Sequence, residues 1–406
     1  MPAHPDLPLP PEADQEKRIF PDTLDLLTVL KEADDRPVCN INDLRREIAI
    51  LQYTGGTTGT PKGAMITHYA LAYACIGTMY WYRHREEDVH LGVTPFFHIM
   101  GQQQLMLTPL TSGGKIVILS RFFPDVVAQA ISKYRCTYWV TAPTAIIAVL
   151  SLPNIKDYDL SSFRCLWTGG APVSVELQKL MSDLVPRAIV GEGYGHTETL
   201  AQGGAVTPLH RYKPGFIGIP PLNDMKIVDL ETGTKELGPN EEGEIIIRGP
   251  SLMMGYWNKP EETKESLREG WFYTGDIGLM DEEGYLKFLS RKKELIKCSG
   301  YSVFPAEVEA LLSRHPAVKE VAVIGIKDPY RGESPKAFIV LEPDYKGKIT
   351  EDEIIEWAKD NMAAYKRPRM VEFRDELPKS AAGKVLKRIL VEEEVIRQAE
   401  RDRGDA

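Results

Sequence analysis

The chain has 406 residues and carries 49 Lys and Arg against 58 Asp and Glu, which gives a net charge of −9. This acidic balance argues against general nucleic-acid binding, because a protein that binds phosphate backbones needs a basic face. A hydrophobic fraction of 43% and a charged fraction of 26% are typical of a globular chain, not of a disordered or fibrous one. At this length we expect two or more domains.

The cysteines are scattered along the chain and form no CxxC pair: Cys39, Cys75, Cys136, Cys165 and Cys298. This usage is typical of a reducing compartment and speaks against a disulfide framework or a zinc knuckle. The first residues lack the charged-then-apolar order of a signal peptide. The most apolar stretch, residues 70–82, is shorter than the roughly 20 residues that a membrane span needs. We therefore expect a buried helix there and a cytoplasmic protein.

In chain order, residues 1–42 are expected to be a leader with one short helix near residues 24–30. Short β-branched runs and helical periods then alternate. We expect strands at 48–53, 115–119, 137–140 and 164–167, and helices at 68–82, 125–134 and 175–184. Alternation of this kind predicts an α/β region with a parallel sheet and helices packed on its faces.

From about residue 226 the pattern changes to short strands separated by turns, which predicts a small antiparallel sheet or barrel. From about residue 293 we expect helices at 305–316 and 350–362 and strands at 318–328 and 335–343. The second helix begins with Thr350 followed by Glu353, the pattern of a capping box. The predicted organisation is a leader (1–42), a large domain (43–290) and a separate, mobile α+β C-terminal domain (291–406).

The most informative motif is YTGGTTGTPKG at residues 53–63, which leaves a predicted strand and is expected to enter a helix. Its glycines let a backbone approach a ligand closely, and its threonines and Lys62 offer donors to phosphate oxygens. It is not a Walker A loop, because a Pro precedes the Lys and a Gly follows it. The motif predicts a phosphate-binding loop. The alternative is a surface turn.

Two further motifs, TGGAP (168–172) and GEGYGHTET (191–199), follow short apolar strands. Their loops should emerge at the same carboxyl edge of the sheet, where open α/β sheets bind ligands. Tyr194 could offer an aromatic face, and Glu198 a carboxylate for a metal or a proton. Taken singly, a half-buried Tyr and a solvated Glu are the simpler interpretations.

Three more segments carry residues that would be unremarkable alone. Asp276 lies between glycines in WFYTGDIG (271–278), where it could also satisfy its own turn backbone. A basic run at 290–309 marks the junction of the two predicted domains, although charge runs are usually solvated faces. Lys384 follows a small-residue loop in LPKSAAGK and would ordinarily be a surface lysine.

Taken together and in this order, YTGGTTGTPKG, GEGYGHTE, YTGDIG, the RKKELIK run and PKSAAGK resemble the core motifs of the adenylate-forming superfamily. That superfamily holds AMP-forming acyl-CoA synthetases, luciferases and the adenylation domains of peptide synthetases. The resemblance runs from about Gln52 to Arg388. Residues 51–68 and 247–263 look most like fatty-acid–CoA ligases.

This resemblance implies a ligase that uses ATP, Mg²⁺ and CoA as a co-substrate. A carboxylic acid would attack the α-phosphate of ATP to give acyl-AMP and pyrophosphate, and the CoA thiol would then displace AMP. The implied substrate is a medium- or long-chain fatty acid. The alternatives are an aryl-acid–CoA ligase, a peptide-synthetase adenylation domain, a luciferase-type oxygenase, and a nucleotide-binding scaffold without turnover.

The resemblance also implies site residues. The phosphate loop would be Thr54, Gly55, Gly56, Thr57, Thr58, Gly59 and Lys62, with Mg²⁺ held by Thr57 and Glu198 and the α-phosphate by Thr197. The adenosine would be bound by Gly170, Ala171, Pro172, Gly193, Tyr194, Asp276 and Arg291, with Tyr194 stacked on the base and Asp276 on both ribose hydroxyls. Lys384 would bridge the carboxylate and the α-phosphate.

The remaining implied residues concern the second half-reaction and the acyl pocket. Lys293 would be the hinge on which the small domain swings, and the turn of Ser299, Gly300 and Tyr301 would then open a path for the pantetheine of CoA. His98 and Gly195 would line the acyl pocket, although a packed core histidine is the alternative for His98.

The chain departs from the family in two ways. Relatives carry a long N-terminal lobe before the phosphate loop, whereas here the loop begins at residue 53. We therefore expect a truncated or naturally short form, or half of a split enzyme. Apolar surface left bare would favour self-association or a partner that carries the lobe. The second departure, Ser290 in place of the usual Asp or Gly, is not expected to disturb the site.

Overall fold

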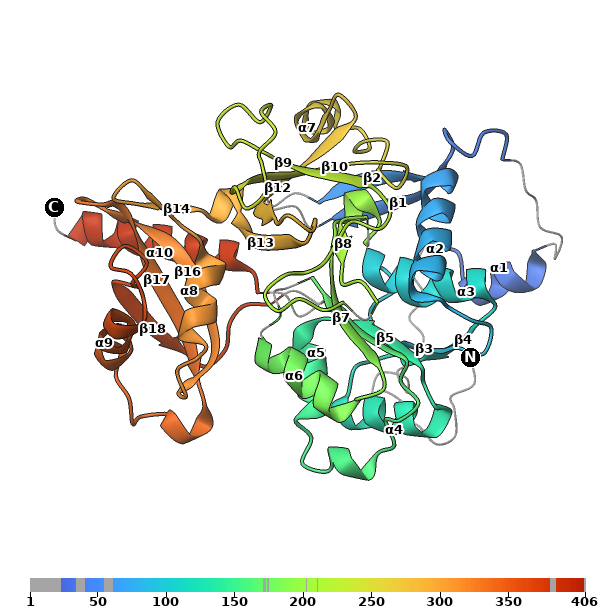
Figure 1. The fold of residues 1–406 in the computed structure, drawn as a ribbon, viewed down its shortest axis with the longest axis horizontal. Helices are drawn as coiled ribbons and strands as arrows, with labels where there is room; N and C mark the ends of the chain where they lie inside the picture. The colour runs from blue at the N-terminus through green and yellow to red at the C-terminus, as the bar shows by residue number, and fades with distance from the viewer. Residues whose placement is uncertain are drawn as a thin grey trace.

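The computed structural model describes residues 23–33, 41–54, 61–170, 173, 175–201, 203–209, 211–379 and 385–404. These residues form a large body built around a six-stranded and a five-stranded sheet, and a smaller C-terminal unit beside it (Figure 1). The short helix expected in the leader is α1 (Leu26–Glu32). Within the described ranges, no helix has both the length and the apolar character needed to cross a membrane.

The six-stranded sheet has the strand order β4 (Lys115–Ile118), β3 (Val89–Gly92), β5 (Tyr138–Thr141), β6 (Cys165–Gly169), β7 (Ile189–Tyr194) and β8 (Ala205–Val206). The first five strands are parallel, and β8 pairs with β7 in the antiparallel sense. The parallel sheet that the alternation predicted is therefore confirmed.

Helices cover both faces of this sheet. On one face α4 (Pro124–Tyr134), α5 (Pro143–Leu150) and α6 (Val175–Leu184) pack against Trp139 and Leu166. On the other, α2 (His68–Tyr82) and the π-helical segment η2 (Met100–Leu107), which continues into α3 (Thr108–Ser112), pack against the alternating residues Tyr138, Val140, Cys165 and Trp167. This strict alternation is what a strand buried on both faces requires.

The expected strand at residues 48–53 exists, but its setting differs from the prediction. It is β1 (Ile48–Thr54), and it pairs antiparallel with β2 (Lys62–Thr67) in a separate two-stranded sheet. The prediction that the Gly/Thr motif enters a helix is therefore wrong. The motif connects two strands, and α2 begins only at His68, where the Thr67 side chain caps it by accepting a hydrogen bond from Ala70 N–H.

The antiparallel sheet predicted after residue 226 is also confirmed. It contains β9 (Asp224–Val228), β10 (Gly243–Arg248), β11 (Leu267–Arg268), β12 (Trp271–Met280) and β13 (Leu286–Arg291), and α7 (Pro260–Ser266) lies before β11. Every pairing in it is antiparallel. Ala205 of β8 shares a buried cluster with Ile245, Ile247 and Leu286, so the two large sheets pack against each other.

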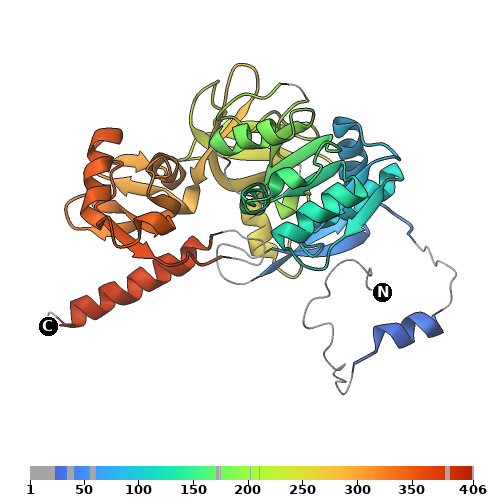
Figure 2. The ribbon, with the colours of Figure 1, turned by 90° about the horizontal axis from the view of Figure 1, so that it is seen from below.

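The C-terminal unit has the α+β composition that the sequence predicted. Its sheet contains β14 (Ile296–Cys298), β15 (Tyr301–Val303), β16 (Val318–Asp328), β17 (Gly332–Leu341) and β18 (Met370–Arg374), and its helices are α8 (Pro305–Leu312), α9 (Glu351–Asn361) and α10 (Lys387–Gly404) (Figures 1 and 2). Thr350 and Glu353 form the expected capping box. The unit has buried clusters of its own. The exact domain boundaries stay predictions.

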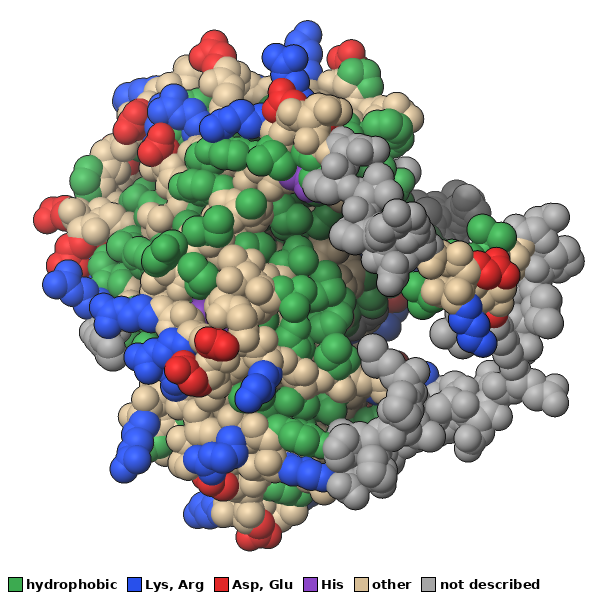
Figure 3. All heavy atoms as spheres, turned by 90° about the vertical axis from the view of Figure 1, so that its right-hand side faces the viewer, with side chains coloured by type: hydrophobic (Ala, Val, Ile, Leu, Met, Phe, Trp, Pro, Cys, Tyr) green, Lys and Arg blue, Asp and Glu red, His purple; other side chains and the backbone are tan. Residues whose placement is uncertain are grey.

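The apolar stretch at residues 70–82 lies within α2, which is buried on one side only. Ala70, Ala74, Cys75, Thr78 and Tyr82 face the interior. Large side chains on the other side are exposed, with Tyr80 at 74%. Exposed apolar residues lie on β1, α2, α3 and β4, and we call this set the apolar face: Leu51, Tyr53, Ile76, Tyr80, Leu110 and Ile118. Figure 3 shows hydrophobic side chains gathered on the side of the body where Figure 1 draws α2, α3 and β4. Bare apolar surface of this kind was expected from the sequence.

Two buried histidines lie at the amino-terminal edge of the parallel sheet. His84 and His90 have ring centroids 4.9 Å apart, and both nitrogens of His90 lack a hydrogen-bond partner among the described residues. With Asp88 they present three potential metal ligands within 4.8 Å. Asp88, however, accepts hydrogen bonds from the Arg164 guanidinium, whose positive charge opposes a bound cation. We therefore interpret the group as part of the core.

Burial lowers the pKa of His84 to about 3 and that of His90 to about 4. Both histidines stay neutral in the folded chain but take up protons in the unfolded chain near pH 6.5. The stabilisation that comes from keeping both histidines neutral is therefore fully present above that pH, and it is lost as the pH drops toward 4. Between pH 7 and pH 5, each histidine lowers the free energy of unfolding by at most about 2 kcal/mol.

We predict that melting temperature falls from pH 7 to pH 5, and that His90→Phe flattens this dependence while His68→Gln, outside the pair, does not. Thermal melts of the three proteins across this pH range provide the measurement. An unchanged slope in His90→Phe would contradict the assignment.

Candidate active site

The carboxyl ends of β6 and β7 meet at one edge of the parallel sheet. The two strands run side by side in register from Cys165 opposite Ile189 to Gly169 opposite Gly193. Gly170 and Gly193 therefore emerge together, as predicted. Gly170 has φ +80°, which favours glycine, and at Gly195 a Cβ would lie 1.5 Å from the Ala201 carbonyl oxygen. Ala171 and Pro172 lie outside the described residues.

A buried carboxylate, Asp276 of β12, is the centre of this edge. The Tyr194 hydroxyl donates to its Oδ2 over 2.9 Å, and His196 Nε2 lies 2.9 Å from the same oxygen. Arg291, directly opposite Asp276 on β13, has its Nε 3.7 Å from Oδ1. The sequence placed Tyr194, Asp276 and Arg291 in one site, and the structure brings them together. The sequence analysis gave no role to His196, although this residue lies in the GHTE motif.

Burial by itself would raise the pKa of Asp276, but the hydrogen bond and charge of His196, the charge of Arg291 and the Tyr194 hydroxyl outweigh it and hold the pKa below its usual value. Burial and the Asp276 charge raise the pKa of Tyr194 well above 10, so its hydroxyl keeps its proton. The Tyr194 ring stands edge-on to His196, with centroids 5.1 Å apart. The result is an ionised carboxylate held in a fixed orientation.

A second carboxylate, Glu198, lies in the short turn η4 (Thr197–Thr199) that follows β7. Its Oε1 accepts a hydrogen bond of 2.6 Å from the Tyr256 hydroxyl, and both side chains are buried. Among the described residues no other hydrogen bond reaches the Glu198 carboxylate, so these residues leave Oε2 for a ligand. A hard oxygen of this kind suits Mg²⁺, which usually binds one or two carboxylates together with substrate phosphates. Thr197 begins the same turn.

The two ends of the predicted phosphate loop are paired across a strand ladder, with Thr54 of β1 opposite Lys62 of β2. The ammonium of Lys62 lies 5.1 Å from the centre of the Tyr256 ring. Gly55, Gly56, Thr57, Thr58 and Gly59 lie outside the described residues. The described part of the loop thus places Lys62 beside the phenol that holds Glu198.

Glu192, on β7 two residues before Tyr194, is a buried carboxyl that the sequence did not single out. Burial raises the pKa of Glu192 to about 8, although a hydrogen bond from the Val173 backbone N–H acts in the opposite direction. That bond fastens β7 to the segment that follows Gly170. Glu192 lies in the GEGYG motif, but its contact with Val173 becomes visible only in the folded structure.

His98 lies between β3 and η2, half-buried, and its Nδ1 accepts a hydrogen bond of 3.2 Å from Met100 N–H. The neighbouring Phe97 carbonyl accepts one from Gln52 of β1, which ties this segment to the strand that leads into the phosphate loop. The predicted contact of His98 and Gly195 with an acyl group stays a prediction.

The predicted hinge follows β13 directly. Lys293 is an exposed residue of the turn η5 (Lys292–Glu294). Beyond it, Ser299 and Gly300 form the tip of the β14–β15 hairpin with φ of +52° and +81°, and Tyr301 stacks on Tyr365. Lys384 lies outside the described residues.

Lys387, at the start of α10, connects this hinge turn to the small unit. Its ammonium lies 3.2 Å from the Glu294 carboxylate in η5 and 2.7 Å from that of Glu309 in α8. The charges of the two glutamates outweigh burial and raise the pKa of Lys387. The last residue of η5 is therefore tied to the C-terminal unit.

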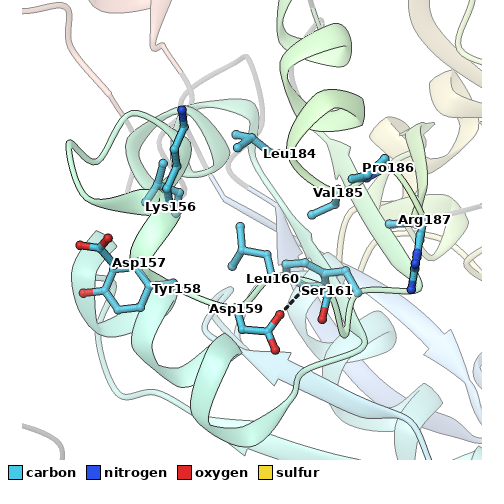
Figure 4. Close-up of a pocket in the computed structure, with 13 residues that line it drawn as sticks. Lys156, Asp157, Tyr158, Asp159, Leu160, Ser161, Leu184, Val185, Pro186 and Arg187 are labelled. Atoms are coloured by element: carbon cyan, nitrogen blue, oxygen red, sulfur yellow. Dashed lines mark hydrogen bonds between the residues drawn. The ribbon is translucent and has the colours of Figure 1, made fainter.

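A hollow in the described surface lies at the other end of the strands. It has a volume of about 540 Å³ and is lined by residues 155–161 and 184–188 with Phe163 (Figure 4). Arg187 and Ala188 immediately precede β7, so this hollow lies at the amino-terminal edge of the strands. Because open α/β sheets bind ligands at the opposite edge, we do not assign the active site to it.

Comparison with known proteins places the chain among AMP-binding enzymes. The family model described as AMP-binding enzyme matches residues 9–257, and the model of its C-terminal domain matches residues 307–384. The chain is 43% identical to a long-chain-fatty-acid–CoA ligase of Bacillus subtilis over 87% of its own length and 63% of that protein. It is 38% identical to 4-coumarate–CoA ligase 2 of Nicotiana tabacum over 89% and 68% of the two lengths.

Among solved structures, ATP-bound MatB from Rhodopseudomonas palustris superimposes with a TM-score of 0.80 and 32% identity, over 87% of this chain and 69% of that one. The o-succinylbenzoate CoA synthetase MenE of Bacillus subtilis, in complex with an acyl-adenylate, gives a TM-score of 0.81 and 31% identity, over 91% and 74%. The chain thus spans about two thirds of the length of these relatives.

Proposed function

The chain belongs to the family of AMP-binding enzymes, and on that premise we propose that it joins a carboxylic acid to CoA through an acyl-adenylate. The observation that carries this proposal is the grouping of Tyr194, His196 and Arg291 around the buried Asp276, beside Glu198, at the carboxyl edge of the sheet. Relatives named as CoA ligases of fatty and aryl acids support it.

In this proposal each described residue has a task that its setting suits. Asp276 accepts hydrogen bonds from the ribose hydroxyls, since an ionised carboxylate is an acceptor only. Arg291 lies at the same carboxylate and offers the ribose a donor. Gly170, Gly193 and Tyr194 border the adenine, and the Thr197 hydroxyl donates to the α-phosphate. Glu198 offers one oxygen to Mg²⁺, which when bound neutralises phosphate charge.

The chemistry follows from the leaving group. A carboxylate is a poor acyl donor because oxide would have to leave. Attack of a carboxylate oxygen on the α-phosphorus forms the acyl–AMP bond and breaks the bond to pyrophosphate. The CoA thiol then attacks the acyl carbon, loses its proton, and AMP leaves. The chain contributes position and charge: Lys62 and the phosphate loop at the leaving pyrophosphate, and Lys384 between the carboxylate and the α-phosphate.

We further propose that residues 43–290 and 291–406 act as two domains that reorient about Lys293 between the half-reactions. The tip of the β14–β15 hairpin, with Ser299, Gly300 and Tyr301, then lines the route of the CoA pantetheine. The ion pairs on either side of Lys293 support this proposal. Lys387 ties Glu294 to the small unit, whereas Lys292 pairs with Glu244 of β10 in the large body.

For the acid we propose a medium- or long-chain fatty acid, on the strength of the 43% identity to a long-chain ligase. An aryl acid is the second candidate, because 4-coumarate–CoA ligases are 36–38% identical over a similar share of the chain. His98 and Gly195 are the residues that we assign to the acyl pocket.

We predict that the purified chain releases pyrophosphate from ATP and Mg²⁺ only when an acid is present. Lys384→Ala should lower this rate by about a hundredfold or more, since it removes a positioned charge at the reacting phosphate. The measurement is a coupled pyrophosphate assay with fatty and aryl acids, with Lys346→Ala, an exposed lysine paired with Asp375, as the control. Release that does not depend on the acid, or that survives in Lys384→Ala, would count against the proposal.

We also propose that the apolar face makes contacts in solution, either with a second copy of the chain or with a partner that carries the lobe. Large exposed apolar patches are uncommon on soluble monomers. For the chain alone we predict an apparent mass above that of a monomer in light scattering at micromolar concentration. Tyr80→Glu with Leu110→Glu should reduce it, whereas Tyr330→Glu on the C-terminal unit should not. A monodisperse monomer would refute self-association.

A further inference from the structure

Tyr256 lies in an extended segment that runs along β2. Met254 N–H donates to the Met65 carbonyl, Met65 N–H to the Gly255 carbonyl, and Trp257 N–H to the Gly63 carbonyl. Tyr256 itself forms an antiparallel bridge with Ala64, and its backbone N–H donates to the Thr263 hydroxyl over 2.8 Å. The backbone that carries the Tyr256 side chain is therefore fixed on both sides.

The Tyr256 side chain contacts two charged groups that come from different parts of the chain. Its hydroxyl donates to Glu198 Oε1 over 2.6 Å, and its ring lies 5.1 Å from the ammonium of Lys62. Only 7% of Tyr256 and 8% of Glu198 are exposed. One phenol thus contacts the carboxylate of η4 and the lysine at the start of β2.

The chemistry of the phenol suits both contacts. The phenol hydroxyl has one proton to donate, and the carboxylate oxygen 2.6 Å away is an acceptor. The hydrogen bond fixes the Glu198 side chain by one oxygen and leaves Oε2 for a ligand. The face of the ring attracts a cation, which restrains the Lys62 ammonium on the other side.

We propose that Tyr256 is a positioning residue that orients the Glu198 carboxylate toward Mg²⁺ and holds the Lys62 ammonium beside the same polyphosphate. This inference rests on the proposed function, because it assumes that Glu198 and Lys62 meet Mg-ATP. It assigns to Tyr256 no contact with the reacting atoms.

A purely structural role would be different. Tyr256 belongs to a buried cluster with Ala64, Ile66 and Phe272, and its ring could serve that packing alone. Phenylalanine would preserve such packing and the ring beside Lys62, and would remove only the hydroxyl. Tyr256→Phe therefore separates the hydrogen bond to Glu198 from the packing.

The test is the affinity for ATP of the full chain, measured by titration calorimetry with Mg²⁺ and again with EDTA. We expect Tyr256→Phe to weaken binding of Mg-ATP about tenfold, as loss of a group that orients a metal ligand commonly does, and to leave binding without Mg²⁺ unchanged. Tyr285→Phe is the matched control, because it removes another buried hydroxyl, one that donates to the Arg211 carbonyl. It should change neither affinity.

Two further variants sharpen the result. In a Glu198→Gln background Tyr256→Phe should add little further loss of Mg-ATP affinity, because the two residues act as one unit. Tyr256→4-aminophenylalanine keeps the ring and a donor, so it should retain most of the Mg²⁺ dependence. It also provides a variant of near-identical shape if the phenylalanine protein is poorly folded.

If Mg²⁺ changes the ATP affinity of Tyr256→Phe as much as that of the unaltered chain, the inference is overturned and the proposed function stands. Equal losses with and without Mg²⁺ would overturn it as well, in favour of packing. Absence of Mg-ATP binding by the unaltered chain would overturn the proposed function and the inference together.

Discussion

The buried charge of Asp276 is the constraint on which the arrangement of the site depends. A carboxylate that is only 4% exposed is costly unless donors and opposite charge surround it. Here they come from both sheets: Tyr194 and His196 from the end of β7, and Arg291 from β13. Removing any one of them would leave the charge less compensated, so the parallel and antiparallel sheets must meet at this point.

The two carboxylates of the site, Asp276 and Glu198, differ in how many donors surround them. Asp276 is surrounded by donors and is held as an ionised acceptor in one orientation. Glu198, two residues beyond His196, is held at one oxygen by Tyr256, and no other described residue bonds its carboxylate. A fully compensated carboxylate suits neutral hydroxyls, whereas one with an open oxygen suits a cation. Residues 194–198 contribute to both settings: Tyr194 and His196 bond Asp276, and Glu198 follows in the short turn η4.

Much of the fold could be predicted from the sequence because its strands are short, apolar and separated by periodic helices. The order of motifs placed Gly170, Tyr194 and Asp276 in one site before any geometry was known. The prediction was wrong at β2, because the six residues of KGAMIT are too short for periodicity to distinguish a strand from the start of α2.

Other features depend on contacts that no local pattern contains. His196 and Tyr256 acquire their roles from partners 80 and 58 residues away, and Glu192 from its burial against Val173. A histidine or tyrosine inside a motif gives no indication of which carboxylate it will meet. The roles of Lys384 and of residues 55–59 remain predictions from resemblance.

We propose that Asp276 holds the ribose of ATP, and the most direct test compares the affinities of the chain for ATP and for 2′,3′-dideoxy-ATP. Loss of both hydroxyls should weaken binding about tenfold or more, as expected for hydrogen bonds to a charged group, and Asp276→Asn should largely remove this preference. Equal affinity of the unaltered chain for the two nucleotides would contradict it.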